Sequence, residues 1–108
     1  MKAIKYEKPW DVACVEMDKP VRKKGEALIK IMTAGICGSD IGAFRGTNGL
    51  VSYPRVIGHE LAGIIEEIDE DNPKGFKVGD HVIVDPYLYC GHCYPCSIGR
   101  TNCCTDLH

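Results

Sequence analysis

Residues 90–104 read CGHCYPCSIGRTNCC and carry four closely spaced cysteines, Cys90, Cys93, Cys96 and Cys104. Thiolate sulfur is a soft ligand that suits zinc, and four thiolates close a tetrahedral shell that leaves no position open for a substrate. The segment therefore predicts a structural zinc site that organises a loop. His92 and Cys103 lie in the same segment and remain alternative ligands, because adjacent residues reach similar space.

Length, charge and cysteine usage narrow the class of protein. The 108 residues include 13 basic and 15 acidic side chains, which indicates one domain, or a piece of one, with no basic stripe for nucleic acid or an anionic membrane. Neither a signal peptide nor an apolar run of membrane length is present, so we expect a soluble, cytoplasmic protein. In a reducing compartment, seven cysteines, five of them clustered in residues 90–104, favour metal over disulfides.

Short β-rich segments separated by glycine and proline predict a mainly β fold, either a barrel or a sandwich. Cys14 is expected in the core, as a small apolar side chain in a strand. Helical turns are expected to begin near Ser39 or Asp40, both good N-caps. The cysteine-rich end is expected to form loop and one short helix. Strands are expected in residues 1–6, 12–17, 25–35 and 76–86 and in the apolar run after Pro54.

A second, dispersed group of residues consists of Cys37 in AGICGSD and the pair His59–Glu60 in VIGHELAG. Each signal is weak alone, because a lone cysteine among apolar residues is more often a small buried side chain, and a His–Glu pair is more often a packing or surface feature. Brought together by the fold, the sulfur and the imidazole could supply two ligands of a catalytic zinc that keeps one position open.

The order of four motifs along the chain strengthens these weak signals. AGICGSD (34–40), GHELAG (58–63), FKVGDHV (76–82) and CGHCYPCSIGRTNCC (90–104) span almost the whole chain. Together they resemble the N-terminal, GroES-like catalytic domain of zinc-dependent medium-chain alcohol dehydrogenases, especially the sorbitol and threonine dehydrogenase branch. The resemblance implies one domain over residues 1–108. Its expected fold is mainly β, a partly open barrel with short helices, and it includes a zinc-binding lobe at about residues 86–106.

The resemblance also implies a role for each matching residue. Cys37 and His59 would bind the catalytic zinc, with Glu60 as an acidic neighbour that ligates the metal or assists exchange of water. Ser39 would carry the proton of the alcohol, and Asp40 would orient the ligating histidine. The structural zinc would be held by four cysteines: Cys90, Cys93, Cys96 and Cys104. From the residues alone, helix capping ranks ahead of catalysis for Ser39 and Asp40.

The implied activity is oxidation of a secondary alcohol, on a sugar alcohol or sugar acid, to a ketone by hydride transfer to NAD or NADP. A full-length subunit would hold two zinc ions and assemble as a homodimer or homotetramer. No GxGxxG fingerprint occurs here, so the Rossmann domain is expected to be absent and the chain alone to be inactive, as a truncated piece ending after the metal loop. Gly42 stands where many relatives have a relay histidine, and Asp69 is expected to alter only a surface turn.

Two other classes of function stay open. A non-enzymatic zinc module would use only the cysteine-rich segment, as a binding or interaction domain. A zinc-free quinone reductase of the same superfamily fits poorly, because those relatives lack the ligand set and the cysteine loop. Counting metal ions separates the first alternative from the enzyme, since the module needs one zinc and the dehydrogenase needs two.

Overall fold

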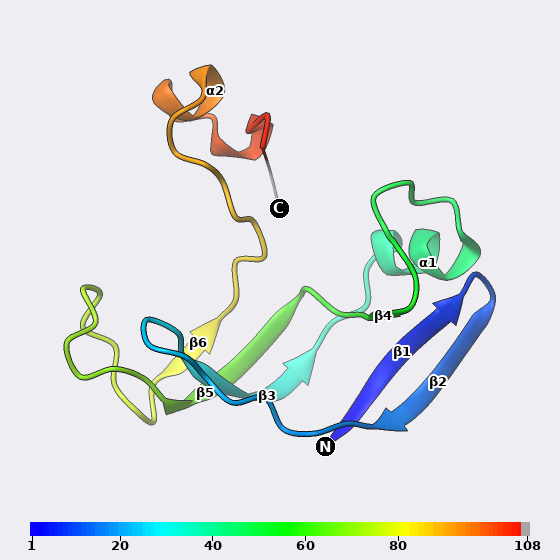
Figure 1. The fold of residues 1–108 in the computed structure, drawn as a ribbon, viewed down its shortest axis with the longest axis horizontal. Helices are drawn as coiled ribbons and strands as arrows, with labels where there is room; N and C mark the ends of the chain where they lie inside the picture. Colours follow the sequence, from blue (N-terminus) through cyan, green and yellow to red (C-terminus); the bar gives the residue numbers. More distant parts are fainter. Residues whose placement is uncertain (107–108) are drawn as a thin grey trace.

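The computed structural model describes residues 1–106, which form two three-stranded sheets with short helical segments between and after them (Figure 1). Every strand pair in this range is antiparallel, so it contains no parallel βαβ unit. The expectation of a mainly β fold with short helices is confirmed, and the sheets are open. The elements in chain order are β1 (Lys2–Lys8), β2 (Asp11–Glu16), β3 (Leu28–Ala34), α1 (Gly38–Arg45), β4 (Arg55–Val56), β5 (Leu61–Glu67), β6 (His81–Ile83), α2 (Tyr94–Ser97) and a 3-10 turn, η1 (Thr101–Cys103).

The first sheet has the order β2–β1–β4 and is built on the β1–β2 hairpin. Along β2, alternate residues are half-buried and exposed, as expected for a strand with one face covered. Cys14 falls on the exposed face, so the expectation that it lies in the core is wrong. Strand β2 lies at the edge of its sheet, and the residues on its covered face are Ala13 and Val15 instead of Cys14.

The second sheet has the order β3–β5–β6, and the pairing of β3 with β5 joins its two longest strands. The register runs from Leu28 opposite Glu67 to Ala34 opposite Leu61. Gly63 lies at the closest approach of the two strands, where an added Cβ would lie 2.5 Å from the Lys30 carbonyl oxygen. Glycine is therefore required here by the packing of one backbone on another.

The strand expected over residues 76–86 is shorter in the structure, because β6 covers only His81–Ile83. The preceding residues form a closed turn instead. The Lys77 N–H donates to the Asp80 carboxylate at 2.8 Å, and the Asn72 side chain bonds both the N–H and the C=O of Phe76. These side-chain bonds satisfy backbone groups that a strand would have paired with a neighbour.

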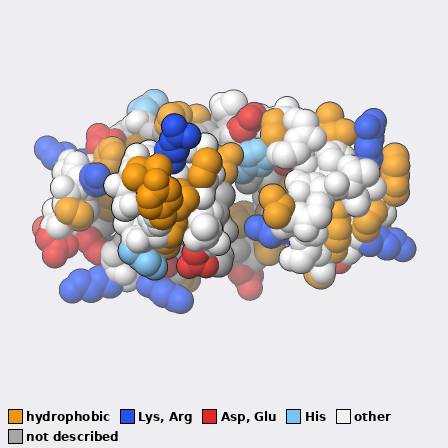
Figure 2. All heavy atoms as spheres, turned by 90° about the horizontal axis from the view of Figure 1, so that it is seen from above, with side chains coloured by type: hydrophobic (Ala, Val, Ile, Leu, Met, Phe, Trp, Pro, Cys, Tyr) orange, Lys and Arg blue, Asp and Glu red, His pale blue; other side chains and the backbone are white. Residues whose placement is uncertain are grey.

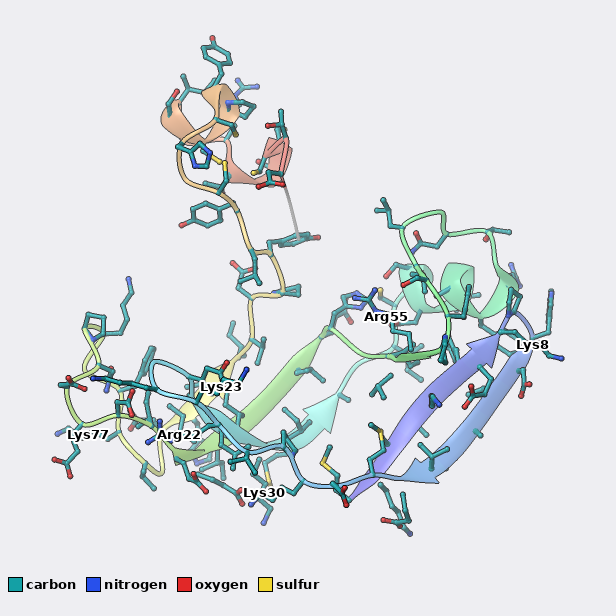
Figure 3. The ribbon with its side chains drawn as sticks, in the orientation of Figure 1. Lys8, Arg22, Lys23, Lys30, Arg55 and Lys77 are labelled. Carbon is teal, nitrogen blue, oxygen red and sulfur yellow. The ribbon has the colours of Figure 1, made fainter. Side chains whose placement is uncertain are left out.

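Asp69 affects more of the structure than the surface turn that the sequence predicts. Its carboxylate accepts a bond from Arg22 at 2.7 Å and another from the Gly25 N–H at 2.6 Å, and both lower the pKa of Asp69. Figure 3 shows Arg22 at the end of the sheet where β5 finishes. These two bonds hold the connection before β3 against the turn after β5.

Few side chains are fully shielded from solvent. The buried hydrophobic residues of the described range are Tyr6, Leu28, Ala43, Ile65 and Cys104. The molecule is flat, with extents of 43 × 38 × 21 Å, and Figure 2 shows hydrophobic side chains on its surface on both sides of a central hollow. Within residues 1–106, no helix has the length and apolar character needed to cross a membrane. Apolar surface exposed on this scale is typical of proteins that pack against further protein.

Replacing Gly63 by alanine is expected to lower the free energy of unfolding by about 1–3 kcal/mol, the usual cost of forcing a methyl group into a packed site. The added Cβ would meet backbone of β3, which cannot rotate away. Urea denaturation of the variant measures the loss. Gly49→Ala is the matched control, because a Cβ there meets no atom within 4 Å. Equal midpoints for the two variants would contradict the close approach.

Candidate active site and metal centres

The end of β3 and the start of β5 define the first candidate site. Ala34 pairs with Leu61, and the Gly35 N–H donates to the Glu60 carbonyl at 2.8 Å, which extends the pairing by one bond. Cys37 follows β3 and His59 precedes β5, so the antiparallel pairing brings these two side chains together across 22 residues of sequence. The Cys37 Sγ lies 3.0 Å from the His59 Nε2.

The helix that follows Cys37 carries two more of the predicted residues. Helix α1 begins at Gly38 with Cys37 as its N-cap, so the expected start at Ser39 or Asp40 is one or two residues late. The Asp40 carboxylate lies within the first turn and accepts the Cys37 N–H at 2.9 Å. This bond satisfies a backbone donor that the helix leaves free, and it allows Asp40 to be buried at 5% exposure.

Four side chains converge at this point. The Asp40 Oδ1 lies 3.4 Å from the His59 Nδ1, on the far side of the ring from Cys37. The Ser39 Oγ lies 2.8 Å from the Cys37 Sγ and 3.2 Å from the His59 Nε2. Cys37, Asp40 and His59 offer ligand atoms within 4.8 Å of one another, and their sulfur, carboxylate and imidazole are all zinc donors.

Aromatic residues that the sequence did not single out hold α1 in place. Trp10 lies in the turn between β1 and β2, and its backbone N–H donates to the Phe44 carbonyl at 2.7 Å. The Trp10 ring packs edge-on against the Phe44 ring, with the ring centroids 5.1 Å apart. The buried Tyr6 hydroxyl donates to the Asp40 carbonyl at 3.4 Å. Burial, and then the Asp40 charge, raise the pKa of Tyr6. Phe44 is far from Tyr6 and Trp10 in the sequence, so the contact between these aromatic residues depends on the fold.

Glu60 lies outside the group of three. Its carboxylate oxygen Oε2 points to the Cα of Gly35, where an added Cβ would lie only 2.7 Å away. The side chain nevertheless lines the same open depression as Cys37, Ser39 and His59. This depression measures about 610 Å³, and its other walls come from Thr33, β5, β6 and the segment after β6, including Pro86 and Tyr87. No sequence pattern singled out Thr33, Pro86 or Tyr87.

The second candidate site is the cysteine-rich end, which Figure 1 shows standing away from both sheets. Cys90, Cys93, Cys96 and Cys104 offer sulfur atoms within 4.8 Å of one another. The sulfurs of Cys93 and Cys104 are 3.9 Å apart, close to the roughly 3.8 Å expected for two thiolates on one tetrahedral zinc with Zn–S distances of about 2.3 Å. The donor set and its spacing fit zinc.

Comparisons with known proteins identify the family of this chain. The alcohol dehydrogenase GroES-like domain family matches residues 23–108, most of the chain. The chain belongs to this family. Its dehydrogenase relatives establish the oxidoreductase family predicted from the four motifs.

The relatives are longer than this GroES-like domain. A zinc-type alcohol dehydrogenase-like protein of Haemophilus influenzae is 55% identical, and the starvation-sensing protein RspB of Escherichia coli is 50% identical, each over 99% of this chain and 31% of the relative. A solved RspB structure from Escherichia coli, complexed with NADH, superposes with a TM-score of 0.86 at 48% identity, over 100% of this chain and 31% of that one. The domain thus spans about a third of the relatives it matches.

In this GroES-like domain, backbone N–H groups donate hydrogen bonds to sulfur atoms of the cysteine quartet. Cys90 donates to the Cys104 Sγ at 3.4 Å, Cys93 to the Cys90 Sγ at 3.4 Å, and Asp106 to the Cys104 Sγ at 3.3 Å. Hydrogen bonds from the backbone at Thr105 and Cys96 lower the pKa of the Cys93 thiol to about 6.

Cys96 shows the opposite behaviour. Burial, and then the thiol of Cys93, raise the pKa of Cys96 to about 12. The four thiols are so close that all of them ionise together only with a cation among them, because like charges at this separation repel. A divalent metal bound among the four sulfurs would supply that positive charge.

The alternative ligands take no part in this cluster. Cys103 is exposed and lies outside the group of four, although it is adjacent to the buried Cys104. The His92 Nδ1 bonds the Cys90 carbonyl at 2.9 Å, and His92 also lies outside the group. Cys103 is the last residue of η1 and Cys104 is its C-cap, and the backbone there leaves Cys103 exposed and Cys104 buried, a distinction that spacing in the sequence does not make.

Cys93→Ser is expected to remove one bound zinc per chain and to lower stability, because metal binding at such a loop contributes to folding. Zinc content after dialysis and the melting temperature measure both effects. Cys103→Ser is the matched control and should retain the zinc. An equal loss of zinc in the two variants would show that the four-sulfur assignment is wrong.

Proposed function

We propose that residues 1–108 form the catalytic domain of a zinc-dependent dehydrogenase. The enzyme oxidises a secondary alcohol group of a polyol or sugar acid to a ketone, with NAD or NADP as hydride acceptor. The observation that carries this proposal is the convergence of Cys37, Ser39, Asp40 and His59 at the wall of an open depression. A structural site alone needs no depression and no nearby hydroxyl.

The donor set suits a catalytic zinc. Cys37 and His59 would hold the ion through Sγ and Nε2, and the depression would leave room for substrate beside them. When bound, zinc would supply a Lewis acid that lowers the pKa of an alcohol and polarises a carbonyl. A second zinc at the cysteine quartet would fix the lobe at about residues 86–106.

Asp40 would orient the histidine ring. Its carboxylate faces Nδ1 at 3.4 Å, which favours a proton on Nδ1 and leaves the Nε2 lone pair directed at the metal side. The same carboxylate accepts the Cys37 N–H, so it holds both protein ligands at once.

Ser39 is placed to receive the proton of the substrate hydroxyl. Its oxygen lies within hydrogen-bond distance of both ligand atoms, at the edge of the depression. Because position 42 is glycine, the proton passes from Ser39 to water or to a hydroxyl of substrate or cofactor.

The substrate class is proposed from the lining and the relatives. Thr33, Ser39 and Glu60 contribute polar groups to a depression whose lining is otherwise largely apolar, so the polyol class rests mainly on the relatives. Relatives include an L-galactonate-5-dehydrogenase of Escherichia coli at 41% identity and a sorbitol dehydrogenase of Bacillus subtilis at 38%, with the chain covering 31% of each.

A dinucleotide-binding domain outside residues 1–108 would complete the enzyme. The related RspB structure holds NADH, and the residues of the present chain carry no glycine-rich fingerprint for it. The exposed apolar side chains, such as Ile83 at 85% exposure, would pack against further protein. We expect residues 1–108 alone to be inactive and the complete enzyme to be a homodimer or homotetramer.

Cys37→Ser in the full-length protein should lower zinc from two to one per subunit and reduce activity by about 100-fold or more, because one ligand of the catalytic ion is lost. Metal analysis and steady-state kinetics with a polyol measure the two effects. Unchanged activity would reject the catalytic-zinc proposal. One zinc in the parent protein would instead favour the non-enzymatic module.

Ser39→Ala should reduce kcat by about 100-fold or more without loss of zinc, because general acid–base groups contribute factors of this size. The pH profile of kcat tests the relay independently, since a lost proton carrier makes the rate depend more steeply on hydroxide. Ser52→Ala, in an exposed loop, is the matched control. Equal kcat values for the two variants would remove Ser39 from the relay.

A further inference from the structure

We infer that Tyr6 is a positioning residue for proton transfer in the proposed reaction: its buried hydroxyl holds the backbone of α1 at the rotation that presents Ser39 to the depression. The inference deepens the proposed function and rests on the role proposed for Ser39. It concerns a residue of the first sheet that lies outside the lining of the depression.

The side chains of α1 provide little apolar surface that could fix its rotation by packing. The helix reads GSDIGAFR, and a helix of eight residues is unstable by itself. Ile41 is exposed, and the buried residues of α1 are Asp40 and Ala43. The rotation of α1 must therefore be set largely by contacts to its backbone and to the ring of Phe44.

Three donors from outside the helix bond carbonyl groups of α1, which lies beside the end of the β1–β2 hairpin (Figure 1). The Tyr6 hydroxyl donates to the Asp40 carbonyl at 3.4 Å, and the Tyr53 hydroxyl donates to the Ala43 carbonyl. A backbone N–H of the β1–β2 turn donates to the Phe44 carbonyl at 2.7 Å. Positions 40, 43 and 44 are spaced i, i+3 and i+4, so the three carbonyls lie on one side of the helix.

Tyr6 is the donor nearest to the reacting groups. Its bond reaches Asp40, the residue next to Ser39, whereas the other two bonds reach the C-terminal end of α1. Tyr6 is only 7% exposed, so this bond forms away from water, where it is stronger. Burial, and then the Asp40 charge, raise the pKa of Tyr6, so the hydroxyl keeps the proton that it donates.

The rotation fixed in this way determines where Ser39 points. Successive residues of an α-helix are about 100° apart around its axis, so Ser39 is exposed while its neighbour Asp40 is buried. The Ser39 hydroxyl then lies 3.2 Å from the His59 Nε2, at the edge of the depression. A displacement of about 1 Å at such a group can cost 100-fold in rate. The hydroxyl of Tyr6 guards against this displacement, because it prevents α1 from turning.

The test uses the full-length enzyme and the variant Tyr6→Phe, which removes the hydroxyl and keeps the ring. We expect kcat to fall by about 10-fold, with KM within about 2-fold and zinc content unchanged, because Ser39 is misplaced while the ligands remain. Hydrogen exchange, followed by mass spectrometry, should become about 5-fold faster in α1 and stay unchanged in β5, as expected for the loss of one hydrogen bond.

A double-mutant cycle with Ser39→Ala separates positioning from a general structural role. If Tyr6 acts through Ser39, Tyr6→Phe should change kcat by less than about 2-fold in the Ser39→Ala background. A general structural role would lower kcat by the same factor in both backgrounds. Tyr94→Phe, which removes an exposed hydroxyl from the cysteine-rich end, is the matched control and should keep the parental kcat.

The outcomes are distinguishable. Unchanged kcat or unchanged exchange of α1 in Tyr6→Phe, or equal factors in the two backgrounds, would overturn the inference and leave the proposed function intact. Failure of Tyr6→Phe to fold or to retain zinc would also overturn it, because the hydroxyl would then serve the fold as a whole. The proposed function fails on a separate result, a full-length protein without zinc-dependent dehydrogenase activity, and the inference fails with it.

Discussion

The pairing of β3 with β5 is the interaction on which the rest of the site depends. Residues near the end of one strand and the start of the other are far apart in sequence, and only the antiparallel register at Ala34 and Leu61 makes them neighbours. The register also requires Gly63, where the two backbones approach too closely for any side chain. A slip of one residue in this register would change which residues beyond the strand ends lie opposite each other.

The carboxylate of Asp40 connects this pairing to the chemistry. It is buried, and it accepts the Cys37 N–H while facing the imidazole of His59. The helix that carries it is short and depends on the β1–β2 turn, through Trp10 and Phe44, for its position. The first sheet thus supports the site of the second, although it contributes no ligand.

The two candidate metal centres are built on different principles. The cysteine quartet lies in one segment. The turns and backbone N–H groups of this segment hold the four sulfur atoms close together. The Cys37–His59 site is assembled from two strand ends and a helix, and it borders a depression. A local site of four sulfurs suits a structural role, whereas a site between elements has a side left open for a substrate.

The sequence by itself determined the family, the mainly β class and the two candidate ligand sets, because motifs and local spacing carry that information. It misjudged Cys14, Asp69 and the start of α1, each of which depends on which face or neighbour the fold supplies. The resemblance favoured Cys104 over Cys103, and only the tertiary structure showed Cys104 buried within the group of four and placed Glu60 against Gly35. The direction of a side chain is set by backbone geometry and long-range pairing, which a linear pattern does not contain.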